Sequence, residues 1–145
     1  MNVSPYVFFN GDCATAFRRY HEILGGELQI MTMADLPEGE EGMPGAEPHH
    51  VMHASITLGD GWLMGSDDPT SDGGPKVGVA VTLAAPSVEE GARVFAALAE
   101  GGTTEMPFGP TFWSTGFGSC VDRFGVPWMV DTVAAEGDQE AGNGQ

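Results

Sequence analysis

The chain has 145 residues, a length that fits one domain or two small modules sharing a core. Its 5 basic and 21 acidic residues give a net charge of −16, which disfavours binding to the phosphate backbone of nucleic acids. The sequence contains neither an apolar run of about 18 residues nor a basic N-terminus followed by an apolar stretch, so we expect neither a membrane span nor a signal peptide.

Two stretches of the chain, 8–28 and 83–103, repeat the same order of features. Each holds the end of an apolar strand, a capped amphipathic helix and a Gly-Gly stop, and strand-like runs follow. A repeat of about 75 residues predicts two similar halves, each with the element order βαβββ. We place these halves at about 1–67 and 76–134, within one domain of residues 1–145 that frames a site.

The first half is predicted to contain one helix and four strands. Asp12 is expected to cap the helix, and Gly25 and Gly26 are expected to end it. The apolar positions of the helix have helical spacing and are Cys13, Phe17, Tyr20 and Leu24. The predicted strands are 3–9, 27–33, 51–58 and 62–66, and residues 35–47, which are acidic and rich in Gly and Pro, are predicted to form a loop.

The second half repeats this order after a linker of turn-forming residues at 67–75. Ser87 and Glu90 form a capping box at the start of its helix, and Gly101 and Gly102 end that helix. The expected apolar stripe of the helix is Val88, Ala92, Phe95, Leu98 and Ala99. The predicted strands are 77–83, 103–108, 112–121 and 126–132, and residues 136–145 are expected to form a mobile tail.

Each helix is expected to cover one face of its sheet, which leaves the other, more polar face to line a cavity. The expected cavity positions are Val51, His53, Ser55, Thr57, Leu63, Gly65, Asp67, Gly78, Ala80, Thr82, Met129 and Asp131. The alternative is a solvent-exposed sheet face, against which three aromatic residues, Phe9, Phe112 and Trp113, argue. Trp113 fits a cavity wall or the core equally well, whereas Trp62 and Trp128 are expected to face the helices.

We therefore predict eight ligand-binding residues: Phe9, His53, Ser55, Asp67, Phe112, Trp113, Met129 and Asp131. His53 is also the candidate catalytic residue, as a hydrogen-bonding group or general base, with a structural histidine as the alternative. His49 and His53 would lie about 13 Å apart at about 3.3 Å per residue, so the histidines do not predict a preformed metal site. Cys13 and Cys120 have no convincing catalytic partner, and we expect them to be free thiols in the cytoplasm.

The tandem βαβββ pattern resembles the vicinal oxygen chelate superfamily of glyoxalase I, extradiol dioxygenases, and fosfomycin and bleomycin resistance proteins. More narrowly, the chain resembles its PhnB-like branch, also described as 3-demethylubiquinone methyltransferase-like. The matching motifs span nearly the whole chain and are Phe9-Asn10-Gly11-Asp12-Cys13-Ala14, Ala16-Phe17, Tyr20, Gly25-Gly26-Glu27, Met52-His53-Ala54, Asp67, Gly101-Gly102, Phe112-Trp113 and Asp122-Arg123-Phe124-Gly125-Val126-Pro127-Trp128. The resemblance implies an α+β fold in which tandem βαβββ modules form curved mixed sheets around a pocket.

The resemblance also implies a divalent metal ion that acts as a Lewis acid on vicinal oxygens of the substrate. The positions of the usual ligands fall at Pro5, Gly65, residues 76–78 and Met129, with Asp131 two residues further on. Proline, glycine and methionine are not ligands for a hard or borderline cation, so we predict no metal site and no cofactor, although a weakly bound divalent metal stays open. No Gly-rich loop opens a helix, so the residues do not support the methyltransferase label.

Two functions remain open. The first is a PhnB-like protein with a small-molecule pocket and an unknown reaction, for which a degenerate and a metal-independent member of the family both stay open. The alternative is a metal-free protein that sequesters its ligand, like bleomycin-type resistance proteins, for which the charge of −16 suits a cationic drug. We expect a homodimer in either case, because members of this superfamily commonly assemble pockets across paired modules.

Overall fold

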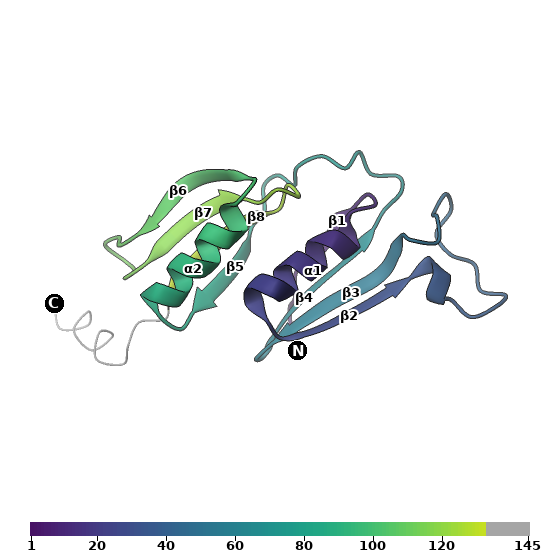
Figure 1. Cartoon of the computed structure of the whole chain (residues 1–145), viewed down its shortest axis with the longest axis horizontal. Helices are drawn as coiled ribbons and strands as arrows, with labels where there is room; N and C mark the ends of the chain where they lie inside the picture. The colour runs from purple at the N-terminus through teal and green to yellow at the C-terminus, as the bar shows by residue number, and fades with distance from the viewer. Residues whose placement is uncertain (133–145) are drawn as a thin grey trace. The chain divides into compact units, whose positions relative to one another are not determined.

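The computed structural model describes residues 1–132, so the predicted tail at 136–145 lies outside the described residues. The chain forms two compact units, Met1–Gly74 and Pro75–Gln145. Each unit is a mixed four-stranded sheet with one helix on one face (Figure 1). The predicted α+β class with two βαβββ halves is confirmed.

The first unit contains β1 (Tyr6–Phe9), α1 (Cys13–Leu24), β2 (Glu27–Thr32), β3 (Val51–Leu58) and β4 (Gly61–Asp67), with a short 3-10 helix at Met33–Asp35. The strand order across the sheet is β1-β4-β3-β2. β1 runs parallel to β4, and the other neighbouring strands are antiparallel.

The second unit contains β5 (Val81–Ala85), α2 (Val88–Ala99), β6 (Thr103–Gly109), β7 (Phe117–Val121) and β8 (Pro127–Thr132). Its strand order, β5-β8-β7-β6, repeats that of the first unit, with β5 parallel to β8. Each helix has 12 residues. No helix within residues 1–132 is long and apolar enough to cross a bilayer.

A phenylalanine of each helix lies directly over a glycine of the sheet beneath it. A Cβ added to Gly65 of β4 would lie 2.7 Å from the Phe17 ring, and one added to Gly118 of β7 would lie 2.8 Å from the Phe95 ring. Such close approach leaves no room for a side chain on the strand, so these glycines mark the helix-covered face of each sheet. Gly65 was expected on the cavity face and is therefore placed wrongly by the sequence analysis.

The register of β4 places Leu63 and Asp67 on the same helix-covered side as Gly65, and Trp62 on the other. Trp62 is 48% exposed, so the prediction that it belongs to the core is wrong. Trp128 is 1% exposed and does belong to the core. The sequence analysis thus assigned the residues of β4 to the two faces of the sheet with an error of one residue. Because side chains alternate along a strand, such an error places every side chain of β4 on the wrong face.

Asp67 ties together three segments of the first unit. Its carboxylate is fully buried and accepts hydrogen bonds from the N–H groups of Gly11 and Cys13 (2.7 and 3.2 Å) and of Val51 (2.8 Å). Asp12 occupies the cap position of α1, but its side chain makes no capping hydrogen bond. The predicted capping role of Asp12 is therefore wrong, and a residue 54 positions after Cys13 supplies it.

The second unit has a buried aspartate of its own, at the β7–β8 turn. Asp122 accepts hydrogen bonds from the N–H groups of Phe124 and Val126 (2.8 and 2.9 Å) and from Nε1 of Trp128 (2.9 Å). Helix α2 is capped locally instead, by the Ser87 side chain, which accepts from the N–H of Glu90 at 3.1 Å. The predicted cap at Ser87 is confirmed.

Three predicted segments of the second unit differ from the structure. Residues 77–80 lie outside β5, with Val77 and Val79 87% and 70% exposed, and Gly78 there has a φ of +82° that breaks the extended run. Residues 112–116 belong to the β6–β7 connection rather than to a strand. The buried positions of α2 are Gly91, Val94, Phe95 and Leu98, so Val88 and Ala92 do not belong to its apolar stripe.

Both cysteines are free and fully buried. Cys13 lies on the buried side of α1, as its spacing predicts. Burial, assisted by the negative charges of Asp122 and Glu105, raises the pKa of the Cys120 thiol to about 11. A neutral, inaccessible thiol of this kind is not a nucleophile at neutral pH.

Asp67→Asn should lower the free energy of unfolding by about 2–4 kcal/mol. The substitution replaces one carboxylate oxygen, which accepts a hydrogen bond from a backbone N–H, with an NH₂ group that cannot accept one. The measurement is urea denaturation followed by circular dichroism. Asp60→Asn, in the exposed β3–β4 turn, removes the same charge and is the matched control. Equal stability of the two variants would contradict the role assigned to Asp67.

Cys120 should make stability depend on pH in the alkaline range. Its folded pKa is raised, so its contribution is complete below the ordinary thiol pKa of 9.0 and is lost as the pH rises toward 11. Wild type should therefore lose more unfolding free energy than Cys120→Ala between pH 8.5 and 10.5, the range we would scan by denaturation. Parallel pH profiles for the two proteins would show that the thiol does not ionise on unfolding.

Candidate functional site

The uncovered face of the first sheet carries two of the predicted residues, His53 and Ser55. Nδ1 of His53 lies 3.4 Å from the hydroxyl of Tyr6, and the two rings are 5.8 Å apart. Ser55 follows two residues later on the same side of β3 and is 3% exposed. His53 can offer a hydrogen bond on this face, whereas the Ser55 side chain is buried. The catalytic role of His53 stays a prediction.

Two other predicted residues of the first unit point to its core. Phe9 is fully buried and meets the Phe17 ring edge-on at 6.2 Å. Asp67 is also fully buried, and its oxygens bind backbone N–H groups. Both side chains therefore lie under α1 rather than on the cavity face where the sequence analysis placed them.

His49 and His50 do not form a metal site with His53. Nδ1 of His50 accepts a hydrogen bond from the N–H of Glu47 at 2.7 Å, and Nδ1 of His49 lies 3.4 Å from the Glu47 carboxylate. Among residues 1–132 no three His, Cys, Asp or Glu side chains converge in a way that could hold a metal ion.

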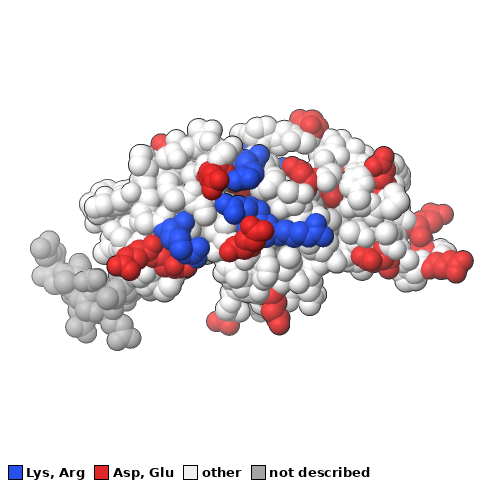
Figure 2. Space-filling view, viewed as in Figure 1, with Lys and Arg blue, Asp and Glu red and all other residues white. Residues whose placement is uncertain are grey.

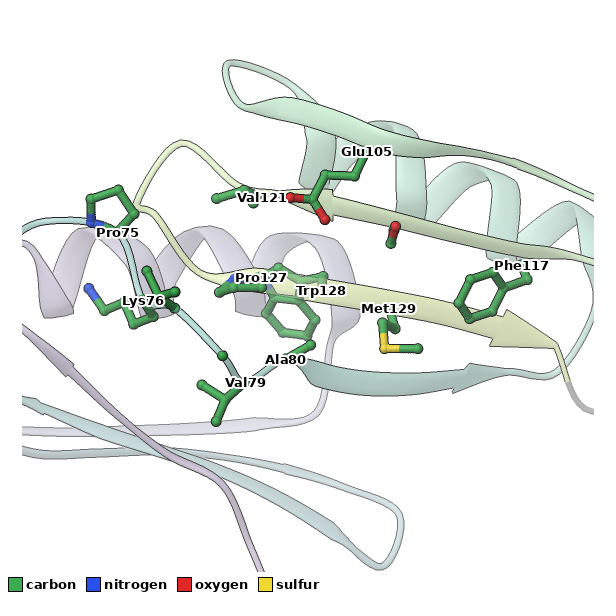
Figure 3. Close-up of a pocket in the computed structure, with 13 residues that line it drawn as sticks. Pro75, Lys76, Val79, Ala80, Glu105, Phe117, Val121, Pro127, Trp128 and Met129 are labelled. Carbon is green, nitrogen blue, oxygen red and sulfur yellow. The ribbon is translucent and has the colours of Figure 1, made fainter.

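The second unit carries a cavity of about 740 Å³ on the uncovered face of its sheet. Six of its lining residues come from β7 and β8: Phe117, Ser119, Val121, Pro127, Trp128 and Met129. Figure 3 shows Phe117 at one end of the cavity and Pro75 and Lys76 at the other. Of the eight predicted ligand-binding residues, Met129 lines this cavity, and so do Gly78 and Ala80, two further positions that were expected on the cavity face.

The segment 75–80 forms one wall of the cavity. The sequence analysis expected Gly78 and Ala80 at cavity positions, and both line the cavity, but it extended the following strand back to residue 77 and assigned no cavity role to Pro75, Lys76, Val77 and Val79. The N–H of Lys76 donates to the carbonyl of Gly125 at 2.9 Å, which anchors the segment to the β7–β8 turn. From there Val77, Val79 and Ala80 line the cavity before β5 begins at Val81. Pro75 and Gly78 were the available signals in the sequence that the strand starts later, and the structure shows a φ of +82° at Gly78.

Apolar side chains dominate the lining, and polar chemistry comes from three residues, Lys76, Glu105 and Ser119. The two charged residues have opposite signs, so the lining has no excess of negative charge. The acidic residues of the chain are spread over the visible surface rather than gathered in one patch (Figure 2). The charge of −16 therefore does not mark this cavity as a site for cations.

The remaining predicted residues, Phe112, Trp113 and Asp131, lie near the Phe117 end of the sheet. The rings of Trp113 and Phe117 are 5.5 Å apart, and those of Phe112 and Trp113 are 4.8 Å apart. Asp131, on β8, accepts a hydrogen bond from the Ser114 hydroxyl through Oδ1. Asp131 thus fixes the turn that carries the two aromatic residues.

The residues present do not fit the metal centre that the fold implies. Pro5 and Met129 offer no oxygen or nitrogen ligand, and Gly65 lies beneath the Phe17 ring on the opposite side of its sheet. Asp67 and Asp131, the two carboxylates nearest to those positions, are hydrogen-bonded within the protein. We therefore assign no step to a metal ion.

Comparison with known proteins agrees with this fold. Residues 1–131 match the family described as 3-demethylubiquinone-9 3-methyltransferase. The protein YjdN of Escherichia coli is 34% identical, over 96% of this chain and all of its own length.

Solved structures show the same similarity. PA1353 from Pseudomonas aeruginosa is 43% identical, with a TM-score of 0.78 over 91% of this chain and 97% of its own. The PhnB protein from Bacillus cereus is 25% identical, with a TM-score of 0.71 over 92% of this chain and 100% of its own. A fosfomycin resistance protein, FosX from Listeria monocytogenes, shares the fold at 10% identity, with a TM-score of 0.62 over 97% of each chain.

The family match covers nearly all of the described chain, and the curated relative matches it from end to end. The resemblance read from the sequence motifs is confirmed at the level of the family and of the glyoxalase-type fold. The chain belongs to the PhnB-like family described as 3-demethylubiquinone-9 3-methyltransferase.

Proposed function

We propose that this protein binds a small, mainly apolar molecule in the cavity of its second unit, without a resident metal ion. The observation that supports this proposal is the cavity itself, about 740 Å³ in volume, on the uncovered face of a sheet. Ligand sites in proteins usually have about 300–1,000 Å³ and combine an apolar lining with a few polar groups.

The polar groups of the lining favour binding and orientation of a ligand. Lys76 brings an ammonium donor, Glu105 a carboxylate acceptor and Ser119 a hydroxyl that serves as either. Neither His nor Cys is among the described lining residues, and the nearby Cys120 thiol is buried with a raised pKa. The proposal therefore names a binding activity and no reaction.

Sequestration of a cationic drug is the second candidate, suggested by the net charge of −16. The balanced charges of Lys76 and Glu105 give it no local support in this cavity. The expected homodimer and cytoplasmic location remain predictions, as does a site framed by both halves of the chain.

Met129→Trp should fill the middle of the cavity and weaken ligand binding by about tenfold or more. The measurement is a fluorescence titration with Nile red, a neutral apolar dye, in the presence of EDTA. Val88→Trp is the matched control, because Val88 is 45% exposed at the start of α2, on the covered side of the sheet.

Wild type and Val88→Trp should bind Nile red alike, with Met129→Trp clearly weaker. Equal affinity of all three proteins would show that the dye binds elsewhere and would contradict the proposal. Saturable binding of bleomycin that is lost in Met129→Trp, with no binding of Nile red, would favour sequestration of a cation.

A further inference from the structure

Three aromatic side chains, Phe112, Trp113 and Phe117, form a continuous cluster at one end of the cavity. Phe117 lines the cavity and lies at the end opposite Lys76 (Figure 3). The Trp113 ring meets Phe117 at an interplanar angle of 64°, and Phe112 meets Trp113 at 81°. Phe117 is 8% exposed, whereas Trp113 and Phe112 are 53% and 97% exposed. The cluster thus extends the cavity wall outward with uncovered aromatic surface.

This surface is held in place by the turn that carries it. The N–H of Thr111 donates to the carbonyl of Ser114 at 2.9 Å, and the N–H groups of Trp113 and Ser114 donate to Oγ1 of Thr111 at 3.3 and 3.0 Å. Hydrogen bonds within the turn therefore fix its backbone before and after Trp113. The backbone that carries Trp113 thus does not have to be ordered when a ligand arrives, which favours binding.

The end of β8 anchors the same turn to the sheet. The Ser114 hydroxyl donates to Asp131, and the hydroxyls of Thr115 and Thr132 lie 2.7 Å apart. Thr132 also donates to the carbonyl of Gly116 at 3.2 Å. Asp131 accepts a second hydrogen bond from the N–H of Thr132 at 2.8 Å. Asp131 and Thr132 thus set where the aromatic cluster stands relative to Met129, their neighbour on β8 in the cavity.

The two ends of the cavity offer different chemistry. The Phe117 end presents aromatic rings, whose faces and edges favour stacking against another planar ring. The opposite end presents Lys76, and Glu105 and Ser119 lie on the side formed by β6 and β7. A ligand that uses both ends needs a planar ring and a hydrogen-bonding substituent.

We propose that the ligand is a planar aromatic molecule with a polar substituent, whose ring stacks at the Trp113–Phe117 end of the cavity. This proposal rests on the proposed function, because it assigns a ligand class to the same cavity. Trp113 is then the residue that discriminates aromatic from saturated rings. Ser114 and Asp131 are positioning residues that hold it.

The test compares 2-naphthol with decahydro-2-naphthol, two ligands with the same carbon skeleton and hydroxyl group. Affinities are measured from chemical shift changes in ¹H–¹⁵N NMR spectra of the full chain. Wild type should bind 2-naphthol about tenfold more tightly than its saturated counterpart. Trp113→Leu should remove most of this preference and leave the affinity for decahydro-2-naphthol nearly unchanged. Trp62→Leu, at a 48% exposed tryptophan of the first unit, is the matched control and should keep the preference.

Ser114→Ala frees the turn from Asp131 and should reduce the preference without removing an aromatic ring. Equal binding of the two ligands to wild type, or an unchanged preference in Trp113→Leu, would overturn the aromatic class while leaving the cavity as the site. Failure of both ligands to shift resonances of Met129 and Phe117 would overturn the cavity assignment as well. Loss of a dimer in Trp113→Leu by sedimentation, with an unchanged ring preference, would assign the cluster to an interface between copies and overturn the proposal.

Discussion

A buried carboxylate organises the first unit. Asp67, at the end of β4, accepts N–H groups from the β1–α1 turn and from the start of β3, so it joins segments 16 to 56 residues away along the chain. A charge with no exposed surface requires these hydrogen bonds, because burying it without them costs several kcal/mol. The same bonds fix the start of α1, and with it the position of Phe17 over Gly65. The covered and uncovered faces of this sheet follow from that placement.

The two units use the equivalent point of their sheets differently. Asp67 pairs with Phe9 at the end of the parallel β1–β4 pair, and Thr132 pairs with Ala85 at the end of the parallel β5–β8 pair. In the first unit this position caps the helix. In the second, Ser87 caps α2, and the end of β8 instead anchors the turn that carries Phe112 and Trp113. The two repeats thus differ at this point, and in the second unit the strand end anchors the aromatic turn beside the cavity.

Local sequence patterns predicted the positions of helices and strands well, but predicted less well which face of a sheet each residue occupies. Helical spacing and the Gly-Gly stop located α1 at Cys13–Leu24, and strict alternation located β3 at Val51–Leu58. The cap at Asp67 could not be predicted, because a contact across 54 residues leaves no local trace. On β4, Gly65 and Trp62 were assigned to the wrong faces. The polarity of the residues does not reveal that the Phe17 ring of α1 packs against Gly65, where a larger residue would leave it no room. In the cavity wall at 75–80, Gly78 and Ala80 were expected at cavity positions, but Val77 and Val79 were not, because valines at alternate positions look like one face of a strand, while β5 begins only at Val81.

We propose that this fold, for which the family resemblance implies metal chelation, serves here as a binding scaffold without a metal ion. Elemental analysis of untagged protein before and after dialysis against a chelator tests this proposal, together with thermal unfolding in the presence of added Mn²⁺, Ni²⁺, Zn²⁺ or Fe²⁺. We predict no stoichiometric divalent ion and no stabilisation by any of these ions, because the positions of the usual ligands hold residues such as Pro5, Gly65 and Met129. One tightly held divalent ion per chain would contradict this account and would return the protein to the chelating enzymes of its fold.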